Sequence, residues 1–275
     1  MPEKCINLYD PKGWRRIRAF IKRTAPASEL AAAANIPADR IFEDEMNKVL
    51  PSYDMLAFEL RVYLEAHGFS FLGVHCCRPL TLCDYYREGF LPLSDSHALR
   101  LIRDYAGGDL CDKDAAVALA ALDLGCRKGV VMFCVGQPED VDDHSRHYLV
   151  IGPEFFCEIT NDYSVPCELR GKFSNALERS LKRAVPTLFS VAVPFDKMSS
   201  RGKDWVISQL IVGHLWLGSV VPKKSKDWGR DMSLECDVPV PVSAIIGHTH
   251  PAKITHYLLG PRTVLEGHPT KCDFC

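Results

Sequence analysis

The chain has 275 residues and a formal net charge of −2. This length allows one large domain or two small ones, and such a chain buries most of its apolar surface without crosslinks. A net charge this close to zero produces no global field that would attract nucleic acid or an anionic membrane, so binding of that kind would need a local patch.

Twelve cysteines would suit a secreted, disulfide-linked protein, but three features argue against that class. The N-terminal stretch has no apolar core followed by a cleavage site. No apolar run reaches the roughly 18 residues that span a bilayer. Cysteines such as Cys126, Cys134 and Cys157 lie inside strand-like or helix-like runs. We expect a cytoplasmic protein without a membrane partner, whose thiols are mostly small buried hydrophobes.

Residues 11–67 are predicted to be helical. Apolar side chains recur at helical spacing in Trp14–Ile21 and again in Phe42–His67, with a break at Pro51. Gly68 follows as the residue that ends the last helix. The chain therefore begins with a helical N-terminal segment.

Strands and helices are mixed after residue 68, which is typical of an α+β protein. Strands are predicted at Phe69–His75, Gly129–Val135, His147–Ile151, Thr187–Pro194 and Val240–Gly247. Helices are predicted just before Gly89 and at Ser96–Tyr105, Lys113–Leu124, Cys167–Arg183 and Trp205–Leu217. We expect a helical N-terminal segment at 1–68, a core at 69–260 and a C-terminal tail at 261–275.

The stretch Arg146–Phe156 combines features that conflict. Tyr148–Ile151 has the composition of a buried strand, and the step Gly152–Pro153 should break it. Glu154 follows at once, ahead of two phenylalanines. The turn either keeps this carboxylate in solvent or directs it into a pocket.

A motif upstream suggests which pocket that could be. The strand ending at His75 is followed, roughly a dozen residues later, by a short helix and the step Gly89–Pro92, Gly-Phe-Leu-Pro. As plain structure this is a strand, a turn and a helix capped by glycine. It also resembles the opening of the ADP-ribosyltransferase superfamily, in which the first core strand ends in His-Gly and a helix leads to a Gly-Leu-x-Pro exit. Cys76 stands where that family has glycine.

The resemblance implies a split antiparallel sheet as the core and NAD as a substrate. It implies that His75 hydrogen-bonds a ribose hydroxyl of NAD and that the backbone of Cys76 holds the nicotinamide amide. Arg78 would contact the pyrophosphate through its guanidinium fork. The family's second strand carries a tyrosine that stacks on nicotinamide; here Phe133 is the aromatic residue in that strand. For each of these residues the alternative is an ordinary structural role.

The resemblance also assigns the catalytic role to Glu154. In the family, one ionised glutamate polarises the ribose hydroxyl and stabilises the oxocarbenium-like state as nicotinamide leaves. The spacing Tyr-Leu-Val-x-Gly-x-Glu, from Tyr148 to Glu154, resembles bacterial proteins of this type. Glu158 is the second candidate for the catalytic acid. Tyr148 is a candidate for binding NAD, with a structural role at the strand edge as its alternative.

The step His248-Thr249-His250 invites a metal interpretation, because alternating histidines at a strand end can share an ion. Metallophosphoesterases end in Gly-His-Thr-His, but their Gly-Asn-His-Asp piece is absent here. JAMM-type deubiquitinases require an aspartate soon after His-x-His-Pro, and none follows Pro251 in the next ten residues. The alternative is that both histidines line the transferase cleft.

A zinc site could also draw on the C-terminus. His256 and the terminal Cys272-x-x-Cys275 offer further ligands, but a single Cys-x-x-Cys without a second pair is a weak signal. We therefore expect no metal. A metal site at His248 and His250 is kept as the alternative.

Two basic segments offer a local patch. One lies on the predicted helix Cys167–Arg183, and the other is Lys223–Arg230, where lysines flank Trp228. Lysines beside an aromatic residue suit single-stranded nucleic acid. The alternative is an ordinary basic surface.

The function that these features favour is an NAD-dependent ADP-ribosyltransferase, a glycosyltransferase that modifies RNA, DNA or protein. Small transferases of this kind act as bacterial toxins or in antiviral defence against phage, so a toxin–antitoxin pairing is expected by analogy. Two alternatives stay open: a metal-dependent hydrolase using the His-Thr-His motif, and a non-catalytic binding protein with the same fold.

Overall fold

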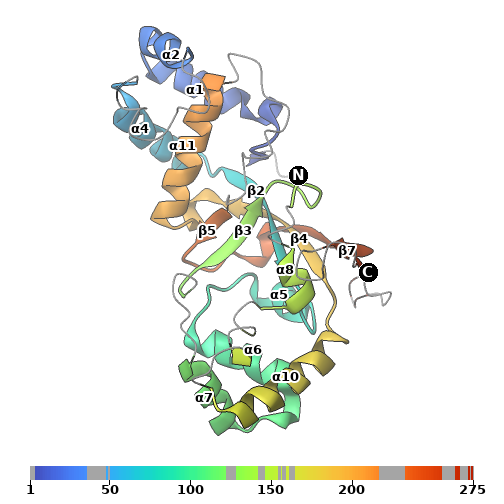
Figure 1. Ribbon diagram of the computed structural model, residues 1–275. Coiled ribbons are helices and arrows are strands. Elements are labelled where there is room, and N and C mark those ends of the chain that lie inside the picture. Colours follow the sequence, from blue (N-terminus) through green and yellow to red (C-terminus); the bar gives the residue numbers. More distant parts are fainter. Residues whose placement is uncertain are drawn as a thin grey trace.

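A six-stranded sheet occupies the middle of the molecule (Figure 1). This computed structural model describes residues 4–35, 48, 50–121, 128–141, 146–153, 156, 159–160, 165–216, 233–255, 264–266, 272 and 274. The strands are β1 (Cys5–Ile6), β2 (Ser70–Cys77), β3 (Val131–Val135), β4 (Thr187–Pro194), β5 (Ser233–Cys236) and β6 (Ile245–Thr249). Their order is β5-β3-β2-β4-β6 with antiparallel neighbours, and β1 pairs in parallel with the start of β2. A separate antiparallel pair consists of β7 (Lys253–Thr255) and β8 (Val264–Glu266).

Two groups of helices lie at opposite ends of this sheet (Figure 1). One group consists of α1 (Arg15–Thr24), α2 (Ala27–Ala33), α4 (Tyr53–Ala66) and α11 (Ser200–Trp216). The other consists of α5 (Cys83–Glu88), α6 (Asp95–Ala106), α7 (Asp112–Ala121), α8 (His147–Ile151) and α10 (Cys167–Leu181). Short 3-10 turns lie at Pro11–Trp14, Gly107–Asp109, Phe195–Lys197 and Val242–Ala244.

The first helical group shares one apolar core with the sheet. Helices α1, α4 and α11 pack against one another, and α4 presents leucines four residues apart to this core. Each fully buried leucine stabilises the fold by about 1.5–3 kcal/mol. A second apolar stripe of α4 faces solvent, and its Phe58 is 67% exposed. The buried stripe is Leu56, Leu60 and Leu64, and the exposed stripe is Met55, Phe58 and Val62.

The second group has its own apolar core. Helices α6, α7 and α10 meet around Ile102, Phe156 and Phe173, which are all fully buried. Phe156 stacks edge-on against Phe173, with ring centroids 5.4 Å apart. The sheet lies between the two helical groups, and the described residues form a third, smaller apolar cluster that includes Val74, Leu149 and Leu188.

The α+β class and the N-terminal helices are confirmed. Strand β4 has the predicted bounds, and α10 begins where predicted but ends two residues earlier, at Leu181. The strand predicted at Val240–Gly247 is wrong in its first half, because residues 242–244 form a 3-10 turn and β6 starts at Ile245. Proline at position 241 cannot donate to a ladder, which explains the late start. Strand β5 was not predicted.

The strand predicted at His147–Ile151 is wrong. These residues form the short helix α8, which Gly152 ends with a φ of 74°. A run of four apolar residues, Tyr148–Ile151, has no periodicity that separates a strand from one helical turn. The break predicted at Gly152–Pro153 is present, but it ends a helix. The part of the predicted helix from Phe42 to residue 47 lies outside the described residues.

The thiols are less buried than expected. Cys76, Cys77 and Cys236 are buried, whereas the other six described cysteines are partly or fully exposed, and none of these nine forms a disulfide. Among the described helices, none has both the length and the apolar character required to cross a membrane.

Replacing Gly89 by alanine is expected to destabilise the fold by at least about 2 kcal/mol. Gly89 ends α5 with φ 76° and ψ −151°, a conformation that is nearly exclusive to glycine, and a Cβ there would lie 2.2 Å from the Val240 carbonyl oxygen. Urea unfolding measures the change. The control is Gly171→Ala in α10, where a Cβ meets nothing within 4 Å and should stabilise the helix by about 0.5–1 kcal/mol. Equal stabilities of the two variants would contradict this assignment.

Candidate active-site cleft

A cavity of about 990 Å³ lies beside the central strand. Its walls come from β2 and β3, from helices α5 and α6, and from the turn at Gly152–Pro153. Ligand sites in proteins typically have volumes of roughly 300–1,000 Å³, so this one is large enough for a ligand of considerable size.

His75 is one of the polar side chains that line this cleft. Its ring lies among three aromatic side chains, with centroids 5.0 Å from Phe90, 5.7 Å from Phe133 and 5.9 Å from Tyr85. Its Nδ1 atom lies 3.2 Å from the Met132 carbonyl oxygen. A carbonyl only accepts, so Nδ1 carries the proton and Nε2 keeps its lone pair. Burial lowers the pKa of His75 to about 4, so the ring is neutral at pH 7 and Nε2 can accept a hydrogen bond.

The main chain of Cys76 faces the cleft edge of β2. Residues of an antiparallel strand point their N–H and C=O groups alternately to one edge and the other. Gly136 donates its N–H to the Leu72 carbonyl, so Leu72 faces β3, and by alternation Val74 and Cys76 do as well. Pairing with β3 ends at Val74. The N–H and C=O of Cys76 therefore lie where β3 has departed from β2.

The thiol of Cys76 is poorly suited to act as a nucleophile. It lies against Cys134, and this hydrogen-bonding contact together with burial raises the pKa of Cys76 well above its usual value. Burial likewise raises the pKa of the neighbouring Cys77 to about 12. A protonated thiol reacts poorly, because the thiolate is the nucleophilic form. Cys76 is therefore more suited to contacts through its backbone, and its contact with nicotinamide stays a prediction.

The guanidinium of Arg78 forms hydrogen bonds with main-chain carbonyls of the protein. It donates to the carbonyls of Leu149 and Val150 in α8 and to those of Leu181 and Ala184 at the end of α10, at 2.7–3.4 Å. The last carbonyls of a helix lack intrahelical partners, so one cation satisfies two helix ends. Arg78 lines the cavity, but a phosphate would have to compete with these carbonyls. Its contact with pyrophosphate stays a prediction.

The other expected NAD-binding side chains also line the cavity. Phe133 is fully buried, and its ring is in contact with His75 and Phe90. Tyr148 is on α8, one turn from the Gly152–Pro153 step. The structure thus brings His75, Cys76 and these two aromatic residues to one cleft.

Both candidate catalytic acids, Glu154 and Glu158, lie outside the described residues. The residues immediately before Glu154 are described, and both Gly152 and Pro153 line the cavity. Gly152 and Pro153, the last described residues before position 154, therefore belong to the wall of the cleft that holds His75.

A polar face of α6 was missed by the sequence interpretation. His97, Arg100 and Asp104 follow one another at spacings of three and four residues and all line the cavity. Arg100 also pairs with Glu88 at 2.9 Å. Burial is the main cause that raises the pKa of Asp104. Helical spacing of three titratable side chains was the signal that could have found this face.

The two histidines of the His-Thr-His motif do not line the cavity. His248 is on β6 and His250 follows its end, and both lie close to Cys272 from the C-terminal region. The expectation that they line the cleft is thus not met, although they come together with a thiol. His256 and Cys275 lie outside the described residues.

Of the two basic segments, the structure describes the one on α10 but not the loop. On α10 and just after it, Lys182 pairs with Glu178 at 2.9 Å, while Arg183 lines the cavity. The loop Lys223–Arg230 lies outside the described residues.

Comparison with known protein families, with curated proteins and with solved structures finds no match for this chain.

Acid is expected to destabilise the protein partly through His75. An unfolded histidine binds its proton near pH 6.5, whereas folded His75 does so only near pH 4, because burial disfavours the charged ring. Between these values the unfolded chain binds more protons, so stability falls as the pH falls. Urea unfolding at pH 7 and pH 5 should give a smaller loss for His75→Gln than for the wild type. An equal loss in both proteins would contradict a His75 pKa below that of an unfolded histidine.

Proposed function

We propose that the cleft binds NAD and that the protein is an ADP-ribosyltransferase acting on a macromolecular acceptor. The observation that carries this proposal is the convergence on one cavity of His75, the main-chain edge at Cys76 and the Gly152–Pro153 step before Glu154. The step Gly89–Pro92 was one of the features that suggested the family. Its residues Gly89, Phe90 and Leu91 line the same cavity. The ADP-ribosyltransferase resemblance implies that these positions, which are far apart in the sequence, lie around one cleft, and their common cavity supports the proposal.

NAD would be held mainly by its nicotinamide riboside end. The Nε2 atom of His75 is an acceptor, which suits the donor of a ribose hydroxyl. The N–H and C=O of Cys76 form a donor–acceptor pair, which matches the carboxamide of nicotinamide. The aromatic side chains around His75 offer a surface for stacking a flat ring.

The reaction would be a group transfer at the ribose C1′ atom. The bond from C1′ to the nicotinamide nitrogen breaks, and its electron pair leaves with nicotinamide. The carboxylate of Glu154 would stabilise the positive charge that develops on the ribose. The acceptor then forms a bond to C1′ and gives up one proton to solvent.

The acceptor would be nucleic acid or protein. Arg183 at the cavity wall is a cation suited to a phosphate backbone, which favours a nucleic acid. A toxin or antiphage role in the cytoplasm, with an antitoxin partner, is proposed by analogy alone. The non-catalytic alternative keeps the same cleft but transfers no label.

Glu154→Gln is expected to reduce the transfer of ADP-ribose at least about 100-fold, because a neutral amide stabilises the developing cation poorly. The protein is incubated with labelled NAD and separate fractions of cell RNA, DNA and protein, and label is counted on each. Glu178→Gln, on the outer face of α10, is the matched control and should keep full activity. Full transfer by Glu154→Gln and loss by Glu158→Gln would move the catalytic role to Glu158.

His75→Ala is expected to weaken NAD binding about three- to tenfold, the effect of one lost hydrogen bond, while the fold persists. Calorimetry measures the affinity, and His67→Ala, a histidine at the end of α4, is the control. Unchanged affinity in His75→Ala would exclude the proposed NAD pose. No binding by the wild type together with no label on any fraction would exclude the transferase.

A further inference from the structure

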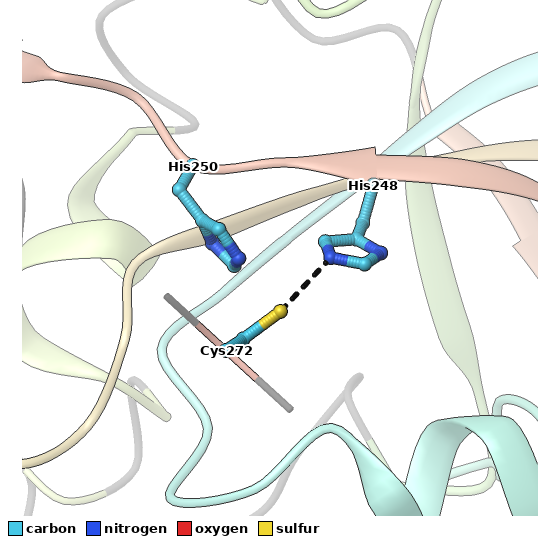
Figure 2. Close-up of side chains that lie close together, drawn as sticks. All are labelled: His248, His250 and Cys272. Atoms are coloured by element: carbon cyan, nitrogen blue, oxygen red, sulfur yellow. Dashed lines mark hydrogen bonds between the residues drawn. The ribbon is translucent and has the colours of Figure 1, made fainter. Parts of the chain in front are cut away.

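The C-terminal Cys272 lies beside two histidines at the edge of the sheet. Figure 2 shows the rings of His248 and His250 and the Cys272 side chain converging on one point. Residues two apart on a strand face the same side, so the end of β6 directs both rings to one face. One ligand atom from each of the three residues lies within 4.8 Å of the others.

The distances suit a soft divalent metal. His248 Nε2 lies 3.2 Å from Cys272 Sγ, and the two imidazole centroids are 5.1 Å apart. Zinc bonds of about 2.0–2.1 Å to nitrogen and about 2.3 Å to sulfur separate neighbouring ligands by between three and four ångströms in a tetrahedron. Small movements of the side chains would therefore close the cluster around one ion.

Each histidine has a second partner that orients its ring. The Nδ1 atom of His250 lies 3.1 Å from the Pro186 carbonyl oxygen, which only accepts, so this nitrogen carries the proton. The Nδ1 atom of His248 lies 2.6 Å from Tyr86 Oη, which accepts from it when Nε2 serves as the ligand. Metal-binding histidines usually donate their other N–H to such an acceptor.

One atom in this cluster lacks an expected partner. The Nε2 atom of His250 is buried and has no hydrogen-bond partner within the described part of the chain. Because Nδ1 carries the proton, Nε2 holds a buried lone pair. Leaving such an acceptor unsatisfied costs about 1–3 kcal/mol. A metal ion would use this lone pair.

We propose that His248, His250 and Cys272 bind one zinc ion. The Cys272 thiol loses its proton to solvent on binding, and both imidazoles bind in their neutral form through Nε2. A nitrogen and sulfur ligand set is the one that zinc prefers.

The position of the cluster indicates a structural zinc. None of its three residues lines the cavity, so the ion does not reach a ligand bound there. Instead it would fasten the C-terminal region to β6, the edge strand of the sheet. Phe274 supports the same contact, since its ring lies 4.5 Å from that of Tyr86. The zinc site is independent of the proposed transferase activity.

A reactive cysteine–histidine pair is the competing explanation for the contact between His248 and Cys272. It accounts for one histidine only and leaves the buried Nε2 atom of His250 unused. Zinc accounts for all three side chains.

The test uses the full chain with zinc and with cobalt as a spectroscopic substitute. Wild-type protein should hold one zinc per chain after desalting, measured by mass spectrometry of the metal. Cobalt should give tetrahedral visible bands and a thiolate-to-cobalt band. Cys272→Ser should lose the thiolate band, and His250→Ala should bind zinc at least about tenfold more weakly. Zinc should also raise the melting temperature and slow the alkylation of Cys272 by iodoacetamide.

Control variants separate ligand loss from general damage. Cys111→Ser and His67→Ala change exposed residues of the same types and should keep zinc. Tyr86→Phe removes the oxygen that orients His248 and should weaken zinc binding about tenfold without removing a ligand. Wild-type protein that retains no zinc, or a cobalt spectrum unchanged in Cys272→Ser, would overturn the proposal.

Discussion

The separation of β3 from β2 is the constraint on which the cleft depends. Strand β4 pairs with β2 at every residue from Ser70 to Cys77, whereas β3 pairs only at Gly73 and Val74. Where two strands part, their main-chain groups need other partners, because a buried unpaired backbone group is costly. The His75 ring supplies one of them by donating to the carbonyl of Met132 on β3. The hydrogen bond from the His75 side chain therefore replaces a main-chain bond between β2 and β3. It leaves the edge of β2 beyond Val74 unpaired with β3.

Arg78 connects this edge to the helical half of the molecule. It follows β2 directly, and its guanidinium binds carbonyls at the ends of α8 and α10. Tyr105 of α6 donates its hydroxyl to the Arg78 carbonyl. One residue thus joins the central strand to three helices, including those that carry Tyr148 and the polar face of α6. The wall of the cleft and the packing of the second helical group are stabilised together.

The register of the sheet relates the cleft to the histidine–cysteine cluster. His75 is opposite Phe189 of β4, and Phe189 is opposite His248 of β6. Cross-strand partners face the same side, so the two histidines lie on one face, two strands or roughly 10 Å apart. The ring of Phe189 lies between them, with its centroid 5.8 Å from that of His248. An apolar ring separates the cleft from the proposed zinc, which is consistent with separate roles for the two sites.

The sequence by itself determined the class of the fold, the N-terminal helices and most elements of the core, because their periodicity is long enough to be distinctive. It also predicted the stop at Gly89, which has a positive φ that residues other than glycine rarely adopt. It could not separate strand from helix at His147–Ile151, because a segment of five residues is too short to show a helical or a strand period. Only the tertiary structure decided that Arg78 binds helix ends and that His248, His250 and Cys272 meet. The reason is physical: spacing along a chain records local geometry, whereas contacts between residues 24 to 106 positions apart follow from strand register and packing.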